Sequence, residues 1–149
     1  MNSSPDGTTS ELLHPMRFVL SLESTFAART FSGDVQHMTN VFTQAMQHPG
    51  FSFVEVLQSC PTYNKQTPHE WYQERVYDIS TIAEFDNTNR TQALAVAEDI
   101  TQKIAVGVLY KDPHSVPQIK RQMNRQNITT ELIEETHTYP IDDLLIQFK

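Results

Sequence analysis

A single cysteine is the residue whose type most suggests redox or metal chemistry in this sequence. Cys60 lies in the segment Ser59-Cys60-Pro61-Thr62-Tyr63-Asn64-Lys65, directly after an apolar run of strand length. Ligands collect at the carboxyl ends of strands in open α/β sheets, so this position suits a binding site. The residue type also fits an ordinary buried thiol, because free cysteine is among the most buried residues. A nucleophilic or redox thiol has weaker support, since Lys65 is the only cation nearby in the sequence.

Several other polar and aromatic side chains have both a functional and a structural interpretation. Arg29 and Asp34 flank an expected strand-to-helix turn, where they could contact a cofactor or a neighbouring subunit. An aspartate near a helix start more often serves only to interact favourably with the helix dipole. Trp71, Tyr72 and Tyr77 occur at helical spacing, which is more typical of packing or an interface than of a stacking platform. The histidines at positions 14, 37, 48, 69, 114 and 137 form no HExxH or comparable pair, so no zinc site is predicted.

The elements that must position these residues alternate between strand and helix patterns. Residues 25–31 and 51–57 have strand composition, and between them apolar residues recur at helical spacing from Val35 to Met46. Such a unit predicts two parallel strands joined by a right-handed crossover. The chain is expected to begin with an irregular lead-in to about residue 15, followed by a short element over 16–22, for which His14-Pro15 favours a helix. The remaining expected elements are helices over 68–77 and 91–102, a buried strand over 104–110, and a polar, peripheral tail.

Bulk composition predicts one folded domain and excludes some partners. The chain has 149 residues, 38% of them hydrophobic and 19% charged, which is far from the composition of disordered chains. Its formal net charge of −7 disfavours nucleic acid and anionic lipid as partners. No apolar run approaches the roughly 20 residues of a membrane span, and the first residues do not resemble a signal peptide. These features and the single cysteine predict a cytoplasmic protein.

Three stretches, taken in order, resemble the β subunit of 2-oxoacid:ferredoxin oxidoreductases. They are Phe26-Ala27-Ala28-Arg29-Thr30-Phe31-Ser32-Gly33-Asp34, then the segment from Gly50 to Lys65, then Glu70-Trp71-Tyr72-Gln73-Glu74-Arg75-Val76-Tyr77. The similarity extends over roughly residues 3 to 112. It implies a three-layer α/β fold with a largely parallel sheet, part of a thiamine-diphosphate-binding fold. The implied divisions are an irregular lead-in (1–15), the C-terminal part of that domain (16–112) and a peripheral extension (113–149).

The resemblance also implies a role for Cys60. In that family the cysteine of the Cys-x-Thr-Tyr/Phe-Asn motif is the fourth thiolate of a four-iron four-sulfur cluster, so Cys60 is the expected metal ligand. The family's other three cysteines and its Gly-Asp-Gly motif, which binds the diphosphate and Mg²⁺, belong to an N-terminal half that this sequence does not contain. The expectation is therefore a C-terminal half only, from a truncated gene, a split gene or a fragment. No catalytic or other cofactor-binding residue is assigned.

The function implied by the resemblance is oxidative decarboxylation of a 2-oxoacid to acyl-CoA, with electrons passing through the cluster to ferredoxin. Thiamine diphosphate, Mg²⁺ and the four-iron four-sulfur cluster are the implied cofactors of the complete enzyme. The implied partners are the enzyme's α subunit, ferredoxin, the 2-oxoacid and coenzyme A. Lys65 could meet either anionic substrate, although a loop lysine is more often only solvated. The isolated chain is expected to be inactive. The alternatives are a non-catalytic remnant or partner-binding module of the same fold and, with less support, a free-standing thiol oxidoreductase.

Overall fold

The computed structural model contains a four-stranded sheet with the strand order β2-β1-β4-β3. The strands are β1 (Phe26–Phe31), β2 (Ser52–Leu57), β3 (Val76–Asp78) and β4 (Ile104–Lys111). β1 and β2 are parallel, as are β3 and β4, while β4 runs antiparallel to β1. The structure describes residues 13–122, 127, 129 and 145–146. The chain divides into two compact units, Met1–Gln118 and Ile119–Lys149, and the sheet lies in the first.

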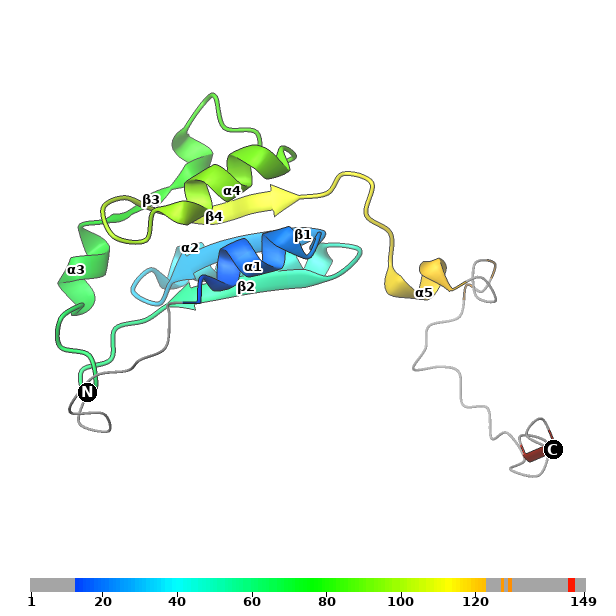
Figure 1. Cartoon of the computed structure of the whole chain (residues 1–149), viewed down its shortest axis with the longest axis horizontal. Coiled ribbons are helices and arrows are strands. Elements are labelled where there is room, and N and C mark those ends of the chain that lie inside the picture. Colours follow the sequence, from blue (N-terminus) through cyan, green and yellow to red (C-terminus); the bar gives the residue numbers. More distant parts are fainter. Residues whose placement is uncertain (1–12, 123–126, 128, 130–144, 147–149) are drawn as a thin grey trace. The chain divides into compact units, whose positions relative to one another are not determined.

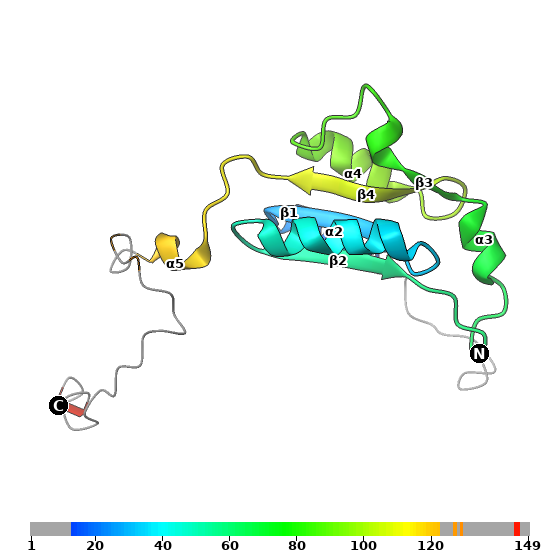
Figure 2. The same cartoon turned by 180° about the vertical axis from the view of Figure 1, so that it is seen from behind.

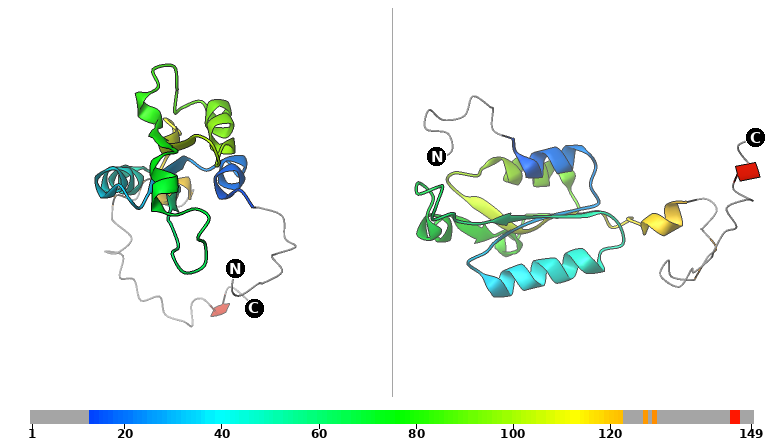
Figure 3. Two further views of the ribbon diagram at one scale, coloured as in Figure 1. Left: turned by 90° about the vertical axis from the view of Figure 1, so that its left-hand side faces the viewer. Right: turned by 90° about the horizontal axis from the view of Figure 1, so that it is seen from below.

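Helices cover both faces of the sheet (Figure 1). α1 (Pro15–Ser21) and α4 (Arg90–Glu98) lie on one face, and α2 (Val35–Gln47) lies on the other, as the edge-on view in Figure 3 shows. Figure 2 shows α2 crossing in front of the β1–β2 pair. The predicted three-layer α/β fold with a mostly parallel sheet is confirmed.

The predicted unit of strand, helix and strand is present as β1, α2 and β2, with the two strands in parallel register. Asp34 is the N-cap residue of α2, and its side chain accepts a hydrogen bond from the backbone N–H of His37 at 2.9 Å. Capping a free N–H in this way favours a helix start at Val35. The helix ends at Gln47, before Pro49, which cannot continue the backbone hydrogen-bond ladder.

Two apolar clusters hold the layers together. One joins α1 and α4 to the sheet, and Phe53, Leu94 and Val96 pack against it; its buried members are Met16, Leu20, Ala27, Ala93, Ala97, Leu109 and Tyr110. The other joins α2 to the opposite face, and Val54 and Val108 pack against it; its buried members are Phe26, Ala28, Val41 and Ala45. Every residue of β1 is buried, because this strand lies between two others and beneath helices on both faces.

A bulge interrupts the pairing of β1 with β4. Ala27 lies opposite Tyr110 and Ala28 lies opposite Val108, so β4 carries one extra residue at this point. Gly107 in the same strand has φ +108°, a conformation that residues with a Cβ rarely adopt. A Cβ at this position would also lie 3.0 Å from Asp78 Oδ1, so the β3–β4 pair is close-fitting here.

Two predicted helices are shorter in the structure than the sequence suggested. The helix predicted over 68–77 is α3 (His69–Gln73), and Val76 and Tyr77 instead pair with β4 as part of β3. The helix predicted over 91–102 ends at Glu98, because the Asp99 carboxylate accepts hydrogen bonds from the backbone N–H groups of Thr101, Gln102 and Lys103, which form a turn. The strand predicted over 104–110 is present as β4, and the helix favoured by His14-Pro15 is α1.

The ends of the predicted domain division fall largely outside the described residues. Most of the predicted lead-in (1–15) and of the predicted extension (113–149) is not described, so these boundaries stay predictions. The remaining short elements are η1 (Ile79–Thr81), a single 3₁₀ turn, and α5 (Gln118–Arg121). In the described part of the chain, no helix is both long enough and apolar enough to cross a membrane.

Candidate functional site

The loop that follows β2 is organised around Cys60 and Asn64. The two residues form an antiparallel bridge, in which the Asn64 backbone N–H donates to the Cys60 carbonyl at 3.1 Å. The Asn64 side chain then donates from Nδ2 to Thr67 Oγ1 at 2.8 Å and accepts from the backbone N–H of Gln66 at 3.1 Å. Asn64 therefore fixes both the turn that carries Cys60 and the segment that leaves it.

The Cys60 thiol is partly exposed and its pKa is lowered from the ordinary value. The backbone N–H of Tyr63 is the largest cause, followed by that of Thr62, while partial burial opposes the shift and Asn64 N–H adds a smaller lowering. Backbone N–H groups that converge on a sulfur stabilise its anionic form. The loop thus lowers the pKa of the thiol through its own backbone N–H groups.

A cavity of about 270 Å³ opens beside the thiol. Its lining combines the Cys60 turn with the start of α3, and consists of Ser59, Cys60, Pro61, Asn64, Lys65, Pro68 and His69. The structure brings Lys65, the one cation near Cys60 in the sequence, to the same cavity as the thiol. His69 also lines this cavity, a role that sequence analysis missed because no motif connects it to Cys60.

The short helix α3 is anchored to the end of β1 by aromatic contacts. The His69 ring lies 5.0 Å from the Phe31 ring, and the Tyr72 ring stacks on Phe31 at 5.5 Å between centroids. Gly33 leaves room for this contact, because a Cβ there would collide with the Phe31 and His69 rings. Trp71 packs edge-on against Tyr72, in agreement with a packing role for these aromatics. These contacts position one wall of the Cys60 cavity.

Arg29, by contrast, is a structural residue. Its side chain is only 1% exposed, and Nε donates to Glu55 Oε2 at 2.6 Å. Its other nitrogens point to the carbonyl oxygens of Ala97 and Ala105, each at 3.4 Å. The suggestion that Arg29 contacts a cofactor or a neighbouring subunit is therefore wrong for this structure, because its guanidinium lies within the fold. Asp34 has the capping role that its place at a helix start favoured.

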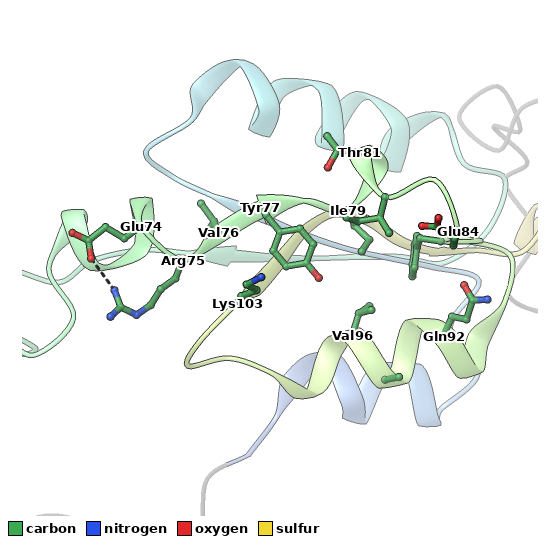
Figure 4. Close-up of a pocket in the computed structure, with 13 residues that line it drawn as sticks. Glu74, Arg75, Val76, Tyr77, Ile79, Thr81, Glu84, Gln92, Val96 and Lys103 are labelled. Carbon is green, nitrogen blue, oxygen red and sulfur yellow. Dashed lines mark hydrogen bonds and ion pairs between the residues drawn. The ribbon is translucent and has the colours of Figure 1, made fainter.

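A second cavity, larger than the one beside Cys60, lies between α4 and the edge strand β3 (Figure 4). It has a volume of about 670 Å³ and a mainly apolar lining, to which Tyr77, Ile79 and Val96 contribute. Arg75 and Lys103 bring positive charge to it, while Glu74 and Glu84 bring negative charge. Sequence analysis missed this cavity. The available signal was that α4 is apolar on more than one face, which is typical of a helix with more than one neighbour.

No cluster of three or more His, Cys, Asp or Glu side chains suited to a metal ion occurs among the described residues. A cluster ligated through Cys60 would therefore need its other thiolates from elsewhere, since this sequence has one cysteine.

Comparisons with known proteins agree with this architecture. Residues 60–127 match the family model for the C-terminal region of the pyruvate ferredoxin oxidoreductase beta subunit. A 2-oxoacid:ferredoxin oxidoreductase subunit beta from Sulfolobus sp. is 29% identical over 119 residues, covering 74% of this chain and 39% of that protein. The corresponding subunit beta of oxidoreductase 2 from Aeropyrum pernix is 30% identical over 107 residues, covering 66% of this chain and 35% of that protein. The 2-oxoglutarate oxidoreductase subunit KorB of Mycobacterium tuberculosis is 37% identical over a shorter match of 62 residues, which covers 42% of this chain and 17% of that protein.

A solved structure has the same fold. It is the 2-oxoglutarate:ferredoxin oxidoreductase from Magnetococcus marinus with 2-oxoglutarate, coenzyme A and succinyl-CoA bound. The match has a TM-score of 0.74 at 22% identity, and covers 99% of this chain and 48% of that one.

The fold and these matches define the chain as related to a subunit of electron-transferring oxidoreductases. More closely, it is a relative of the β subunits of 2-oxoacid:ferredoxin oxidoreductases, and it matches the model of their C-terminal region over residues 60–127. The predicted resemblance is confirmed. The chain spans only 39% of the length of the Sulfolobus relative.

Proposed function

We propose that this chain is the C-terminal part of the β subunit of a 2-oxoacid:ferredoxin oxidoreductase, in which Cys60 is one thiolate ligand of a four-iron four-sulfur cluster. The complete enzyme would convert a 2-oxoacid and coenzyme A to acyl-CoA and carbon dioxide, and would pass a pair of electrons to ferredoxin. The proposal rests on the Cys60 loop. Cys60 is the first residue of the region 60–127 that matches the family model, and its thiol has a lowered pKa.

The residues of the loop suit this role. A metal binds the thiolate form of cysteine, and the N–H groups of Tyr63 and Thr62 favour that form. Pro61 restricts the backbone next to the ligand, and Asn64 ties the turn together, so the sulfur has little local freedom. When bound, such a cluster accepts and passes on electrons one at a time, at a potential that depends on hydrogen bonds to its sulfurs and on exposure.

Thiamine diphosphate and Mg²⁺ belong to the proposed complete enzyme, where they would supply the decarboxylation chemistry. We assign no residue of this chain to hold them. The isolated chain is accordingly proposed to be inactive, and the working enzyme to include the α subunit and the rest of the β subunit. We place the protein in the cytoplasm, where a single reduced thiol is stable.

The ligand assignment can be tested by reconstituting iron and sulfide anaerobically into a complex of this chain with the rest of a β subunit and an α subunit. Cys60→Ser should lower the iron content and weaken the paramagnetic signal of the reduced cluster. Ser59→Ala is the matched control, because it changes the neighbouring residue of the same loop and removes no thiol. If Cys60→Ser leaves iron content, signal and ferredoxin reduction as they are in the control, Cys60 is not a ligand.

The proposed inactivity of the isolated chain needs a separate test. The purified chain should neither bind thiamine diphosphate with Mg²⁺ in isothermal titration nor reduce viologen when given a 2-oxoacid and coenzyme A. Binding or viologen reduction by the chain alone would contradict the proposal. A complex that assembles fully but never oxidises a 2-oxoacid would instead favour the non-catalytic, partner-binding alternative.

A further inference from the structure

One wall of the Cys60 cavity comes from the start of α3, a helix of only five residues. So short a helix has little stability of its own, because isolated helices shorter than about 12–15 residues are marginal in water. No side chain caps the N-terminus of α3 either. The position of this wall therefore depends on contacts between α3 and the rest of the fold.

α3 is held at both of its ends. Beyond its C-terminal end the chain enters β3, and the Ile104 N–H of β4 donates to the Arg75 carbonyl at 2.8 Å. At its N-terminal end the His69 ring packs on Phe31, the last residue of β1, with the two ring centroids 5.0 Å apart. The parallel strands β1 and β2 both run toward α3 (Figure 1). His69 is thus held at the end of the sheet where the Cys60 turn begins.

Gly33 is the residue that makes room for this packing. A Cβ at position 33 would collide with the rings of both Phe31 and His69. The glycines with positive φ are Gly50 and Gly107, so the backbone conformation of Gly33 does not itself require glycine. What the fold requires at position 33 is space, because any side chain there must displace one of the two rings.

His69 is the lining residue best placed to close the cavity beside the thiol. It is half-buried, as is Cys60, and its ring is fixed by packing on Phe31. A loop lysine such as Lys65 has a long side chain that loses more rotamer freedom when it is ordered, so it is a poorer cover. The exposed lining residues are Pro61, Asn64, Lys65 and Pro68.

We propose that the His69 ring shields the Cys60 corner of the iron-sulfur cluster from water, and that Phe31 and Gly33 are the positioning residues that hold the ring there. The inference rests on the proposed function. A cluster ligated through Cys60 has one iron on this sulfur, so the side chain that bounds the space beside the sulfur also bounds that corner of the cluster. Exposure to water is one of the features that set the reduction potential of such a cluster.

The test uses the reconstituted complex of this chain with the rest of a β subunit and an α subunit. The rate at which an iron chelator bleaches the cluster measures its exposure, and a redox titration followed by the paramagnetic signal measures its potential. His69→Ala and Gly33→Ala should each speed bleaching severalfold and raise the potential, because water reaches the cluster and stabilises its reduced, more negative form. Ser32→Ala is the matched control for Gly33→Ala, since it changes the same turn and adds no atom near the rings.

His69→Phe separates shielding from hydrogen bonding. Phenylalanine keeps a ring that can pack on Phe31 but has no donor, so the bleaching rate and the potential should stay close to those of the original complex. A hydrogen bond from His69 to a cluster sulfur would be lost in both His69→Phe and His69→Ala, and the potential would then fall in both, because such bonds stabilise the reduced form. A lower potential in both variants overturns the shielding role.

Access to the thiol can also be measured on the full chain without a cluster. The quantity is the ratio of two labelling rates of Cys60, one with a bulky maleimide and one with iodoacetamide. Both reagents attack the thiolate, so the ratio does not depend on the fraction of thiolate present. His69→Ala and Gly33→Ala should raise this ratio severalfold, and Ser32→Ala should leave it unchanged.

The failure of this inference and the failure of the proposed function give different results. A complex with Cys60→Ser that keeps its full iron content and signal overturns the proposed function, and the shielding of a cluster with it. If Cys60→Ser loses the cluster but neither His69→Ala nor Gly33→Ala changes the bleaching rate or the labelling ratio, the ligand assignment stands and the shielding role is overturned. Circular dichroism checks that each variant is folded, and His69→Ala decides the outcome if Gly33→Ala does not fold.

Discussion

The buried ion pair between Arg29 and Glu55 gives a prediction in which the two partners are not equivalent. Arg29 is 1% exposed, whereas Glu55 is 18% exposed on the edge strand β2. Glu55→Gln would leave a fully buried guanidinium without a counter-charge, with two carbonyl contacts at 3.4 Å and a neutral amide acceptor as its remaining partners. Removing one partner of a buried pair typically costs about 3–5 kcal/mol, and because the amide can still accept from Nε we expect about 3 kcal/mol here.

Arg29→Met should cost less, although Arg29 makes more contacts. Methionine fills a similar volume, and Glu55 at the sheet edge can turn its carboxylate toward water. We therefore expect about 1–2 kcal/mol, close to the cost of unsatisfied polar groups. The double variant with Arg29→Met and Glu55→Leu contains no buried charge, so its stability should return to within about 1 kcal/mol of the original.

Urea unfolding followed by circular dichroism measures these free energies of unfolding. The exposed pair of Arg17 and Glu98, at 3.2 Å, supplies a control. Glu98→Gln should cost less than about 0.5 kcal/mol, because water screens an exposed pair. The reasoning is refuted if Arg29→Met costs more than Glu55→Gln, or if the double variant loses the sum of the two single effects.

Three further predictions concern other sites. The rate of Cys60 alkylation by iodoacetamide should rise with pH, and the midpoint of this pH profile should lie below that of an ordinary thiol. Asn64→Ala should move the midpoint to higher pH, because it loosens the turn that holds the backbone N–H groups near the sulfur. Equal midpoints in the two proteins would contradict this prediction. Burial, and then the charge of Lys111, lower the pKa of His48 in the folded chain. Its stabilising contribution should therefore be complete above the unfolded pKa of about 6.5 and be lost as the pH falls below it, and His48→Phe should flatten this part of a melting-temperature profile. Asn89→Ala removes the N-cap that accepts from two backbone N–H groups of α4 and should cost about 1 kcal/mol in urea unfolding; an unchanged midpoint would argue against a capping role.

The local pattern of residues was sufficient to predict the unit of β1, α2 and β2. Apolar spacing from Val35 to Met46 and the cap at Asp34 involve residues close in sequence, so both can be recognised without knowing which distant segments the helix contacts. The position of Cys60 after a strand was predictable for the same reason. The helix predicted over 68–77 was too long because Val76 is drawn into the sheet by pairing with Ile104, a residue far away along the chain.

Tertiary structure alone decided the features that depend on distant partners. The sequence indicated strands but not that β4 would lie between β1 and β3, antiparallel to β1 and parallel to β3, because strand order depends on which edges meet after folding. It could not show that Arg29 would be buried against Glu55, since residue type alone favours an exposed arginine. Nor could it show that His69 would reach the Cys60 cavity, a position set by its packing on Phe31. Local sequence was enough to predict the unit of β1, α2 and β2 and the position of Cys60 after a strand. Contacts across the sheet determined what surrounds these residues, because burial and charge pairing exist only once distant segments are brought together.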